Sequence, residues 1–419
     1  MTYVRFAMST SNRLIARNSH AALFLGRCSL LLLPLASYTS IPGVVAAFEG
    51  ARAEGDPVQD RKDAAKADLE RSKRFEAIQA LPAANRAKEL LKIVRDGEEV
   101  DVLYAAPMLI DNEELKGEAL DVLTSRLKTV SEYSRRAIIN RMRFAKRDER
   151  YAAIARQALE DIARGEKQDI EAEQAVGLVG DAASLLLKSG MQESDTDLLR
   201  SAVHAFPDSF AVWIVLAKHG LAGAEECKIA RKVYEDKENL PALRVGAAVA
   251  CAGDEQARQF VLREVRVFLE EFGSRSLEDL FPSGWQDEAA QRLFGRLRRD
   301  RVLVALLVAL DSPEAQDLTF KYLWSPNLEI RNVVHLVVAQ KWPDRLLDTT
   351  GADPSDEAKQ LVGLAVHFHP QLRSVVEGRI PKAEFDKRLQ AAKAIIERPV
   401  YGEAERLVIE WEGGQRTVP

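Results

Sequence analysis

Residues 238–266, ENLPALRVGAAVACAGDEQARQFVLREVR, decide the fold. In the first half of this stretch, Leu243 and Ala247 belong to an apolar set at three- and four-residue spacing, with small residues between its members. This pattern is typical of a buried helix whose backbone lies close to its neighbours. Pro241 suits a first helical turn, and Gly253 separates this helix from a second one with its own apolar face. We therefore expect two helices joined by a tight turn.

The composition of the whole chain favours helices. The chain has 419 residues, of which 47% are hydrophobic and 29% charged, enough for a large folded body. Only 7% are aromatic, and Ala, Leu and Val dominate the apolar residues, so helix formers outnumber strand formers. The sequence predicts an all-α protein. A net charge of -5 argues against nucleic acid as the main partner.

Basic residues placed just ahead of apolar stretches recur along the chain at a regular interval. They are Lys116, Arg156, Arg200, Arg244, Arg331 and Arg373. Successive members are 40, 44, 44, 87 and 42 residues apart, and 87 is about twice 43. This period and the helix pair at 238–266 resemble the HEAT-repeat (armadillo-like) α-solenoid family, whose repeats span ~40–47 residues. The resemblance implies a right-handed α-solenoid of HEAT-like helical hairpins with an extended surface for protein partners.

A rival register covers part of this array. Pro207 and Pro241 are 34 residues apart, and Trp213, Leu216 and Ala217 precede Pro241 at offsets that resemble the tetratricopeptide repeat. A short tetratricopeptide-like section at about 170–241 is therefore the alternative there. Either register gives stacked helical hairpins.

Changes in composition divide the chain into five segments. They are a leader (1–53), a charged linker or helix (54–74), HEAT-like repeats (75–273), a second half of the array after an irregular connection (274–397) and a tail (398–419). Near the end of the tail, RLVIEWEGGQRTV alternates and contains Gly-Gly. This pattern predicts a small β-hairpin or an extended C-terminal tail.

The leader has the features of a secretory signal peptide. Residues 1–48 contain four arginines and no acidic residue, and residues 28–47 carry no charge. The protein is then periplasmic or secreted, with no stable membrane insertion after cleavage. The alternative is an uncleaved membrane anchor, since about 20 uncharged residues can just span a bilayer.

Two cysteines lie beyond the leader. Cys227 falls early in one expected helix (224–236) and Cys251 late in the next. If these helices run antiparallel, both thiols lie at one end of the hairpin, where a disulfide would stabilise the fold by about 3 kcal/mol in an oxidising compartment. The alternative is two buried thiols that act as small apolar residues.

Two arginine clusters are the candidate partner sites. Arg136, Arg143 and Arg147 fall on one face of an expected helix by their spacing, and Arg296 and Arg299 belong to a second cluster. One interpretation is a basic ridge that receives an acidic protein partner. The other is a solvated face that neighbouring Glu and Asp residues balance.

Catalytic and cofactor motifs are absent from the sequence. It contains no G-x-G-x-x-G, G-x-x-x-x-G-K-[ST], G-x-S-x-G, H-E-x-x-H or C-x-x-C. His367 and His369, with a carboxylate such as Asp356, are the one candidate metal site, but positions i and i+2 of a helix point in different directions. We therefore predict no catalytic residue, metal or cofactor.

Two functions remain as hypotheses. The first is an exported non-enzymatic scaffold or adaptor that mediates protein–protein interaction. The second is a hydrolase or lyase that acts on envelope polymers, with a catalytic acid at about 270–300, where the repeat breaks down. A Glu or Asp with a raised pKa in a deep pocket would favour the enzyme, and a groove lined by Arg or Trp would favour the scaffold.

Overall fold

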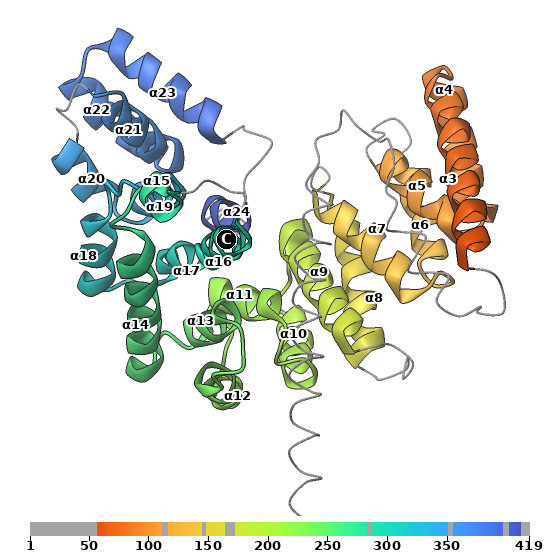
Figure 1. The fold of residues 1–419 in the computed structure, drawn as a ribbon, viewed down its shortest axis with the longest axis horizontal. Coiled ribbons are helices and arrows are strands. Elements are labelled where there is room, and N and C mark those ends of the chain that lie inside the picture. The colour runs from red at the N-terminus through yellow and green to blue at the C-terminus, as the bar shows by residue number, and fades with distance from the viewer. Residues whose placement is uncertain are drawn as a thin grey trace, which may run out of the picture. The chain divides into compact units, whose positions relative to one another are not determined.

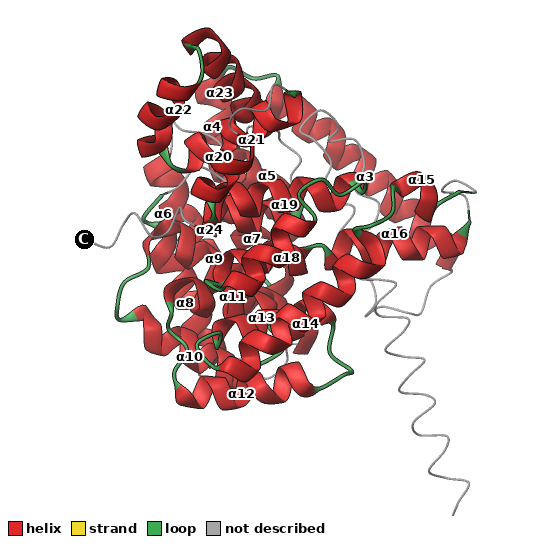
Figure 2. Ribbon diagram, turned by 90° about the vertical axis from the view of Figure 1, so that its left-hand side faces the viewer, coloured by secondary structure: helices red, strands yellow, loops and turns green. Residues whose placement is uncertain are grey.

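The computed structural model describes residues 57–110, 116–144, 148–163, 172–282, 287–350, 355–396 and 402–411. Every regular element in these ranges is a helix (Figure 2). The all-α prediction is therefore confirmed for the described part of the chain. The predicted leader, 1–53, lies outside the described residues.

The chain divides into two compact units, Met1–Arg86 and Ala87–Pro419. In the first unit, α3 (Pro57–Gln79) carries the charged segment that was expected as a linker or helix. Phe75 and Ile78, three residues apart, are buried, while most of the charged side chains described in this helix face solvent. The next helix, α4 (Ala83–Asp96), begins in the first unit and ends in the second.

The remaining helices belong to the second unit. The first ten are α5 (Glu99–Ile110), α6 (Lys116–Arg126), α7 (Glu132–Phe144), α8 (Tyr151–Ala163), α9 (Ala172–Gly190), α10 (Asp195–Ala205), α11 (Phe210–His219), α12 (Ala224–Glu235), α13 (Pro241–Ala250) and α14 (Glu255–Phe272). They are followed by α15 (Leu277–Leu280), α16 (Glu288–Asp300), α17 (Val302–Ala305), the 3-10 helix η2 (Leu306–Ala309), α18 (Pro313–Lys321), α19 (Leu328–Lys341) and α20 (Pro343–Thr350). The last are α21 (Asp356–Phe368), the 3-10 helix η3 (Pro370–Leu372), α22 (Arg373–Arg379), α23 (Lys382–Ile396) and α24 (Glu403–Trp411).

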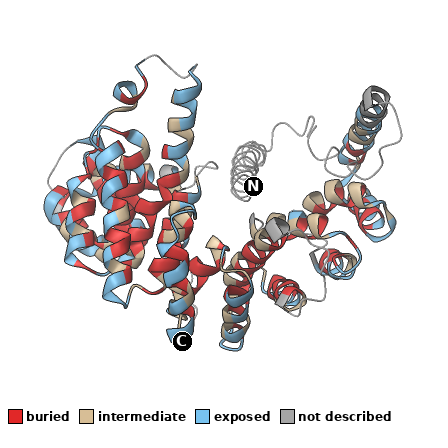
Figure 3. Ribbon diagram, turned by 60° about the horizontal axis from the view of Figure 1, so that its bottom comes forward, coloured by how far each residue is buried: buried red, intermediate tan, exposed pale blue. Residues whose placement is uncertain are grey.

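Alternate helices of the second unit pack on one another along the chain (Figure 1). The row α5, α7, α9, α11 and α13 continues through α17, α19, α21 and α23. Of the helices between them, three form a second row, in which α8 packs on α10 and α10 packs on α12. Apolar residues are buried where helices meet, and exposed residues lie on the outward sides (Figure 3). Each helix in the rows therefore buries an apolar stripe against helices that are near it in sequence.

The stretch 238–266 folds into the two helices that its pattern predicts. Ala247 is buried in α13, which packs on α11, α12 and α14. Asp254 caps α14, since its side chain accepts a hydrogen bond from the backbone N–H of Gln256. Leu240, which shares the apolar spacing, is 50% exposed because it precedes α13 as its N-cap.

The apolar run at 302–310 is buried, but little of it is α-helix. The α-helix α17 covers four residues and then tightens into η2. All residues of this run except Ala309 are buried. None of the described helices has both the length and the apolarity that a bilayer crossing needs.

The prediction of a β-hairpin or extended tail is wrong for residues 403–411, which form α24. Ala404, Val408 and Trp411 are buried at helical spacing, and they pack against α17 and α19. The short run RLVIEW fits a strand and a helix equally well, so its partners decide its structure. The Gly-Gly pair at 413–414 lies outside the described residues.

Candidate functional site

One face of α7 carries polar side chains that converge on α9. Arg136, Asn140 and Arg143 are four and three residues apart, so they share this face. Arg136 Nε lies 3.2 Å from Asp181 Oδ2, and Arg143 Nη1 lies 3.1 Å from Asp181 Oδ1. Asn140 Nδ2 lies 3.4 Å from both oxygens. Two of the three arginines predicted for the first cluster therefore meet on one carboxylate of the neighbouring helix.

The arginines of this cluster are more exposed than the carboxylate that they share. The side chain of Asp181 is 8% exposed, whereas those of Arg136 and Arg143 are 37% and 31% exposed. Two guanidinium groups share the buried carboxylate of Asp181, and Arg143 also feels the charge of Glu403 of α24. Planar guanidinium groups match the geometry of carboxylates. The cluster therefore holds two arginines in fixed positions while part of each still reaches solvent.

A glycine of α9 allows Arg136 to reach Asp181. A Cβ atom at Gly177 would lie 2.2 Å from Cζ of Arg136, so the guanidinium group occupies the place of a side chain. Gly177 and Asp181 are four residues apart and share a face of α9. Helical spacing predicted the arginines, whereas neither Gly177 nor Asp181 was predicted.

Two lysines bind the carbonyl groups at the ends of helices. Lys188 Nζ donates to the carbonyl of Arg143 at 2.6 Å, and Lys218 Nζ donates to the carbonyl of Glu410. Carbonyls in the last helical turn carry partial negative charge, which favours a cation there. Burial lowers the pKa of Lys188, and it lowers the pKa of Lys218 to about 8.

The two lysines occupy equivalent places in a short sequence repeat. Both stand in Leu-x-Lys-x-Gly, at 186–190 and 216–220, at the ends of α9 and α11. Gly190 and Gly220 have φ values of 121° and 62°, in the region that favours glycine. This repeated motif could have located both lysines from the sequence.

The helix α24 brings a further carboxyl group near the Asp181 cluster. The surrounding protein raises the pKa of Glu403 by desolvation, while Arg143 and Arg406 oppose the rise and Asp181 adds to it. Glu403 is exposed to solvent. Glu403 is the described carboxyl group that best matches the raised pKa expected of a catalytic acid, although it lies far from 270–300 in the sequence.

A buried ion pair fastens α24 to the helix rows. Arg301 Nη2 lies 3.1 Å from Glu405 Oε2, and each side chain is 7% exposed. Arg301 also pairs with Glu329 of α19. Burial lowers the pKa of Arg301, and the charge of Glu405 opposes this shift. Together with Lys218, Arg301 holds α24 by charged contacts at two points.

The second predicted cluster is also paired within the protein. Arg296 binds Glu271 of α14 through both Nη atoms, at 2.9 and 2.7 Å. Arg299 Nε lies 2.6 Å from Oδ1 of Asp300, the next residue. These contacts lie on α14 and α16, apart from the α7 and α9 cluster. Arg147 lies outside the described residues.

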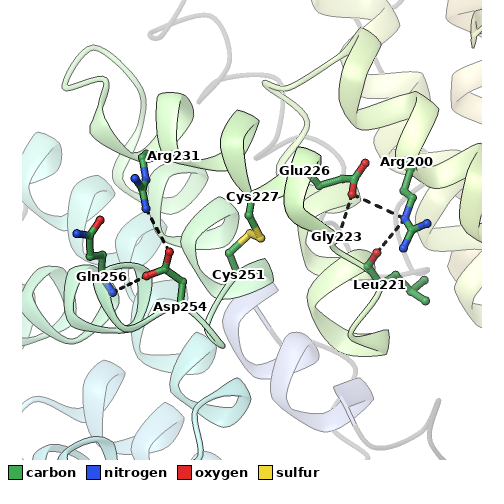
Figure 4. The surroundings of a disulfide bond; sticks show 9 residues. All are labelled: Arg200, Leu221, Gly223, Glu226, Cys227, Arg231, Cys251, Asp254 and Gln256. Carbon is green, nitrogen blue, oxygen red and sulfur yellow. Dashed lines mark hydrogen bonds and ion pairs between the residues drawn. A yellow bond between two sulfur atoms is a disulfide. The ribbon is translucent and has the colours of Figure 1, made fainter.

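Cys227 and Cys251 form a disulfide bond between α12 and α13, with their Cα atoms 5.7 Å apart (Figure 4). The bond joins the start of α12 to the end of α13, as antiparallel helices require. Charged contacts flank it: Glu226 accepts from the N–H of Gly223 at 2.8 Å, and Arg231 pairs with Asp254 at 3.2 Å. Of the two alternatives that the sequence left open, the structure thus has the disulfide and not two buried thiols.

The histidine pair of α21 does not gather metal ligands. His369 Nε2 lies 2.6 Å from the carbonyl of Gln340, and the ring of His367 lies edge-on to Phe368. Among the described residues, no group of three or more His, Cys, Asp and Glu side chains could hold a metal ion.

No family model, curated protein or solved structure matches the chain.

Proposed function

We propose that the protein is an exported, non-enzymatic scaffold that binds an acidic segment of a protein partner. Its architecture would be a right-handed α-solenoid of HEAT-like hairpins, with a tetratricopeptide-like section at about 170–241. The two rows of helices that pack with near neighbours in sequence support this architecture. Repeat arrays of this kind present extended surfaces to other proteins.

The observation that carries the proposal is the arrangement of Arg136 and Arg143 on Asp181. A guanidinium group that is already held in place loses little conformational freedom when it binds a ligand. The planar guanidinium group matches the geometry of a carboxylate, so we expect a carboxylate as that ligand. The site would therefore recognise an acidic residue or a short acidic segment, and it would do so without chemistry.

Export rests on two features of the chain. The basic leader with its uncharged core has the pattern of a secretory signal peptide. The Cys227–Cys251 disulfide fits an oxidising compartment, where such bonds persist. A periplasmic or secreted location satisfies both features.

Site-specific photo-cross-linking tests the function. A photoreactive amino acid replaces Asn140, which lies between the two arginines on α7, and the protein is irradiated in an envelope extract. The matched control places the same amino acid at Lys228 of α12, whose side chain is 69% exposed. We expect a defined acidic polypeptide cross-linked at position 140 and absent at 228. Equal products at both positions, or no polypeptide at 140, would reject the scaffold.

Glu403 favours a second candidate, a hydrolase or lyase of envelope polymers. A raised pKa favours the protonated carboxyl group that a general acid requires, and desolvation raises the pKa of Glu403. Purified protein would be incubated with peptidoglycan and other envelope glycans, and the products separated by mass spectrometry. Cleavage that Glu403→Gln abolishes would support the enzyme, whereas an unchanged polymer or cleavage retained in Glu403→Gln would reject this role of Glu403.

A further inference from the structure

The helix α24 does not follow the packing order of the other helices. The preceding helix, α23, packs on α21, whereas α24 packs on α17 and α19. Figures 1 and 2 both show α24 apart from α23. Its last turn also reaches α11, where Lys218 donates to the carbonyl of Glu410, 192 residues away in sequence. In a helical array each repeat contacts its neighbours, so α24 lies on the array and is not one of its repeats.

The contacts of α24 resemble those of a bound amphipathic helix. Ala404, Val408 and Trp411 form its buried apolar stripe, at positions i, i+4 and i+7. Glu405 lies beside this stripe and pairs with Arg301. Amphipathic helices of one protein bind grooves of another through such an apolar stripe. In α24, one charged residue adds to the contact.

Arg301 and Lys218, the two residues that hold α24, would each interact with another group or with solvent if α24 were absent. Arg301 would keep its ion pair with Glu329, and Lys218 would regain solvent. Burial lowers the pKa of Lys218 to about 8, and the charge of Glu410 in α24 opposes this shift. The charged contacts under α24 are therefore compatible with an open site.

We propose that the surface formed by α17, α19 and Lys218 is a binding site for a helix of a protein partner, which α24 occupies until that partner replaces it. The partner segment is an amphipathic helix with a carboxylate at i, an aliphatic residue at i+3 and an aromatic residue at i+6, as in Glu405, Val408 and Trp411. This inference rests on the proposed function because it takes the partner to be a protein. It adds a second surface, the class of helix that this surface binds and the element that competes for it.

Charge reversal at the anchor tests exchange in the full-length protein. Glu405→Arg should release α24 by repulsion from Arg301 and leave the site unaltered, so a labelled peptide of residues 400–413 should bind in trans. The reciprocal test uses a chain with Arg301→Glu and two peptides, one unaltered and one carrying Glu405→Arg. This chain should bind the Glu405→Arg peptide at least roughly tenfold more tightly than the unaltered peptide. Fluorescence anisotropy measures both, and circular dichroism checks that the variants are folded.

The double variant Arg301→Glu/Glu405→Arg is the matched control. It restores the ion pair within one chain, so α24 should close the site and neither peptide should bind tightly. The inference fails if the folded single variants bind no peptide, or if Glu405→Arg unfolds the chain, since α24 would then be part of the core. It also fails if the wild-type chain forms dimers that exchange α24, because the occupant would then be a second copy.

The two proposals can fail separately. Capture of a protein at Asn140 without peptide exchange would reject this inference and keep the proposed function. Peptide exchange with no protein captured at Asn140 would reject the function.

Discussion

Arg136 Nε lies 3.2 Å from Asp181 Oδ2, which joins two helices across 45 residues of sequence. Arg143 binds the other oxygen of the same carboxylate, so Asp181 orders two arginines of α7 at once. The contact stabilises the packing of α7 on α9 and also positions the groups that would receive an acidic partner. Structure and proposed function therefore depend on the same carboxylate.

Replacement of this carboxylate should destabilise the protein. Asp181→Asn removes the negative charge that lies between two guanidinium groups, so the free energy of unfolding should fall. We expect a decrease of only about 1–2 kcal/mol, because solvent still reaches both arginines. Urea unfolding measures the change. The control is Glu225→Gln in an exposed pair with Lys228, which should shift stability by less than about 0.5 kcal/mol. Equal effects of both substitutions would show that Asp181 has no special role.

Loss of the disulfide should lower stability by about 3 kcal/mol, since Cys227 and Cys251 close a loop with a sequence separation of 24. Thermal unfolding with and without a thiol reductant measures this effect. The Cys227→Ala/Cys251→Ala variant should melt at one temperature under both conditions. A wild-type melting temperature that ignores the reductant, once a thiol assay confirms reduction, would contradict the prediction.

Acidification should destabilise the fold through His335. Burial lowers the pKa of this side chain to about 4, although its Nε2 lies 2.9 Å from the carbonyl of Leu323. An unfolded histidine has a pKa near ~6.5, so the unfolded state binds more protons between these values and stability is lost as the pH falls through them. Between pH 7 and pH 4, the free energy of unfolding should fall by about 3 kcal/mol less in His335→Phe than in the wild type. Denaturant titrations at several pH values measure both losses, and parallel curves would refute the assignment.

A methyl group at Gly363 should disrupt the packing of α21 on α23. A Cβ there would lie 2.2 Å from the carbonyl oxygen of Arg388, a backbone atom that cannot rotate away. Gly363→Ala should therefore destabilise by about 2 kcal/mol or more. Gly295→Ala is the control, because nothing lies within 4 Å of its Cβ and alanine favours helix by about 1 kcal/mol. Thermal unfolding of both variants should give shifts of opposite sign, and a neutral Gly363→Ala would show that the two helices can separate freely.

Sequence patterns within a few tens of residues predicted the helices and helix ends that such short segments determine. The helix beginning at Pro241 followed from apolar spacing, and the pairing of Cys227 with Cys251 was open to prediction because both lie at helix ends. Asp181 was missed because a lone acid in an apolar stretch has no periodicity of its own. Helix α24 was missed because its anchor, Arg301, is about 100 residues away, and no local pattern encodes such a contact.

The most direct test of the central claim measures how the cross-link at Asn140 depends on Arg136. The photoreactive protein is compared with the same protein carrying Arg136→Gln, and with a control carrying Arg292→Gln at a side chain that is 77% exposed. We predict that the acidic polypeptide product falls roughly tenfold with Arg136→Gln and stays unchanged in the control. An unchanged product in Arg136→Gln, or a product that contains glycan and no polypeptide, would contradict the claim that this surface receives an acidic protein partner.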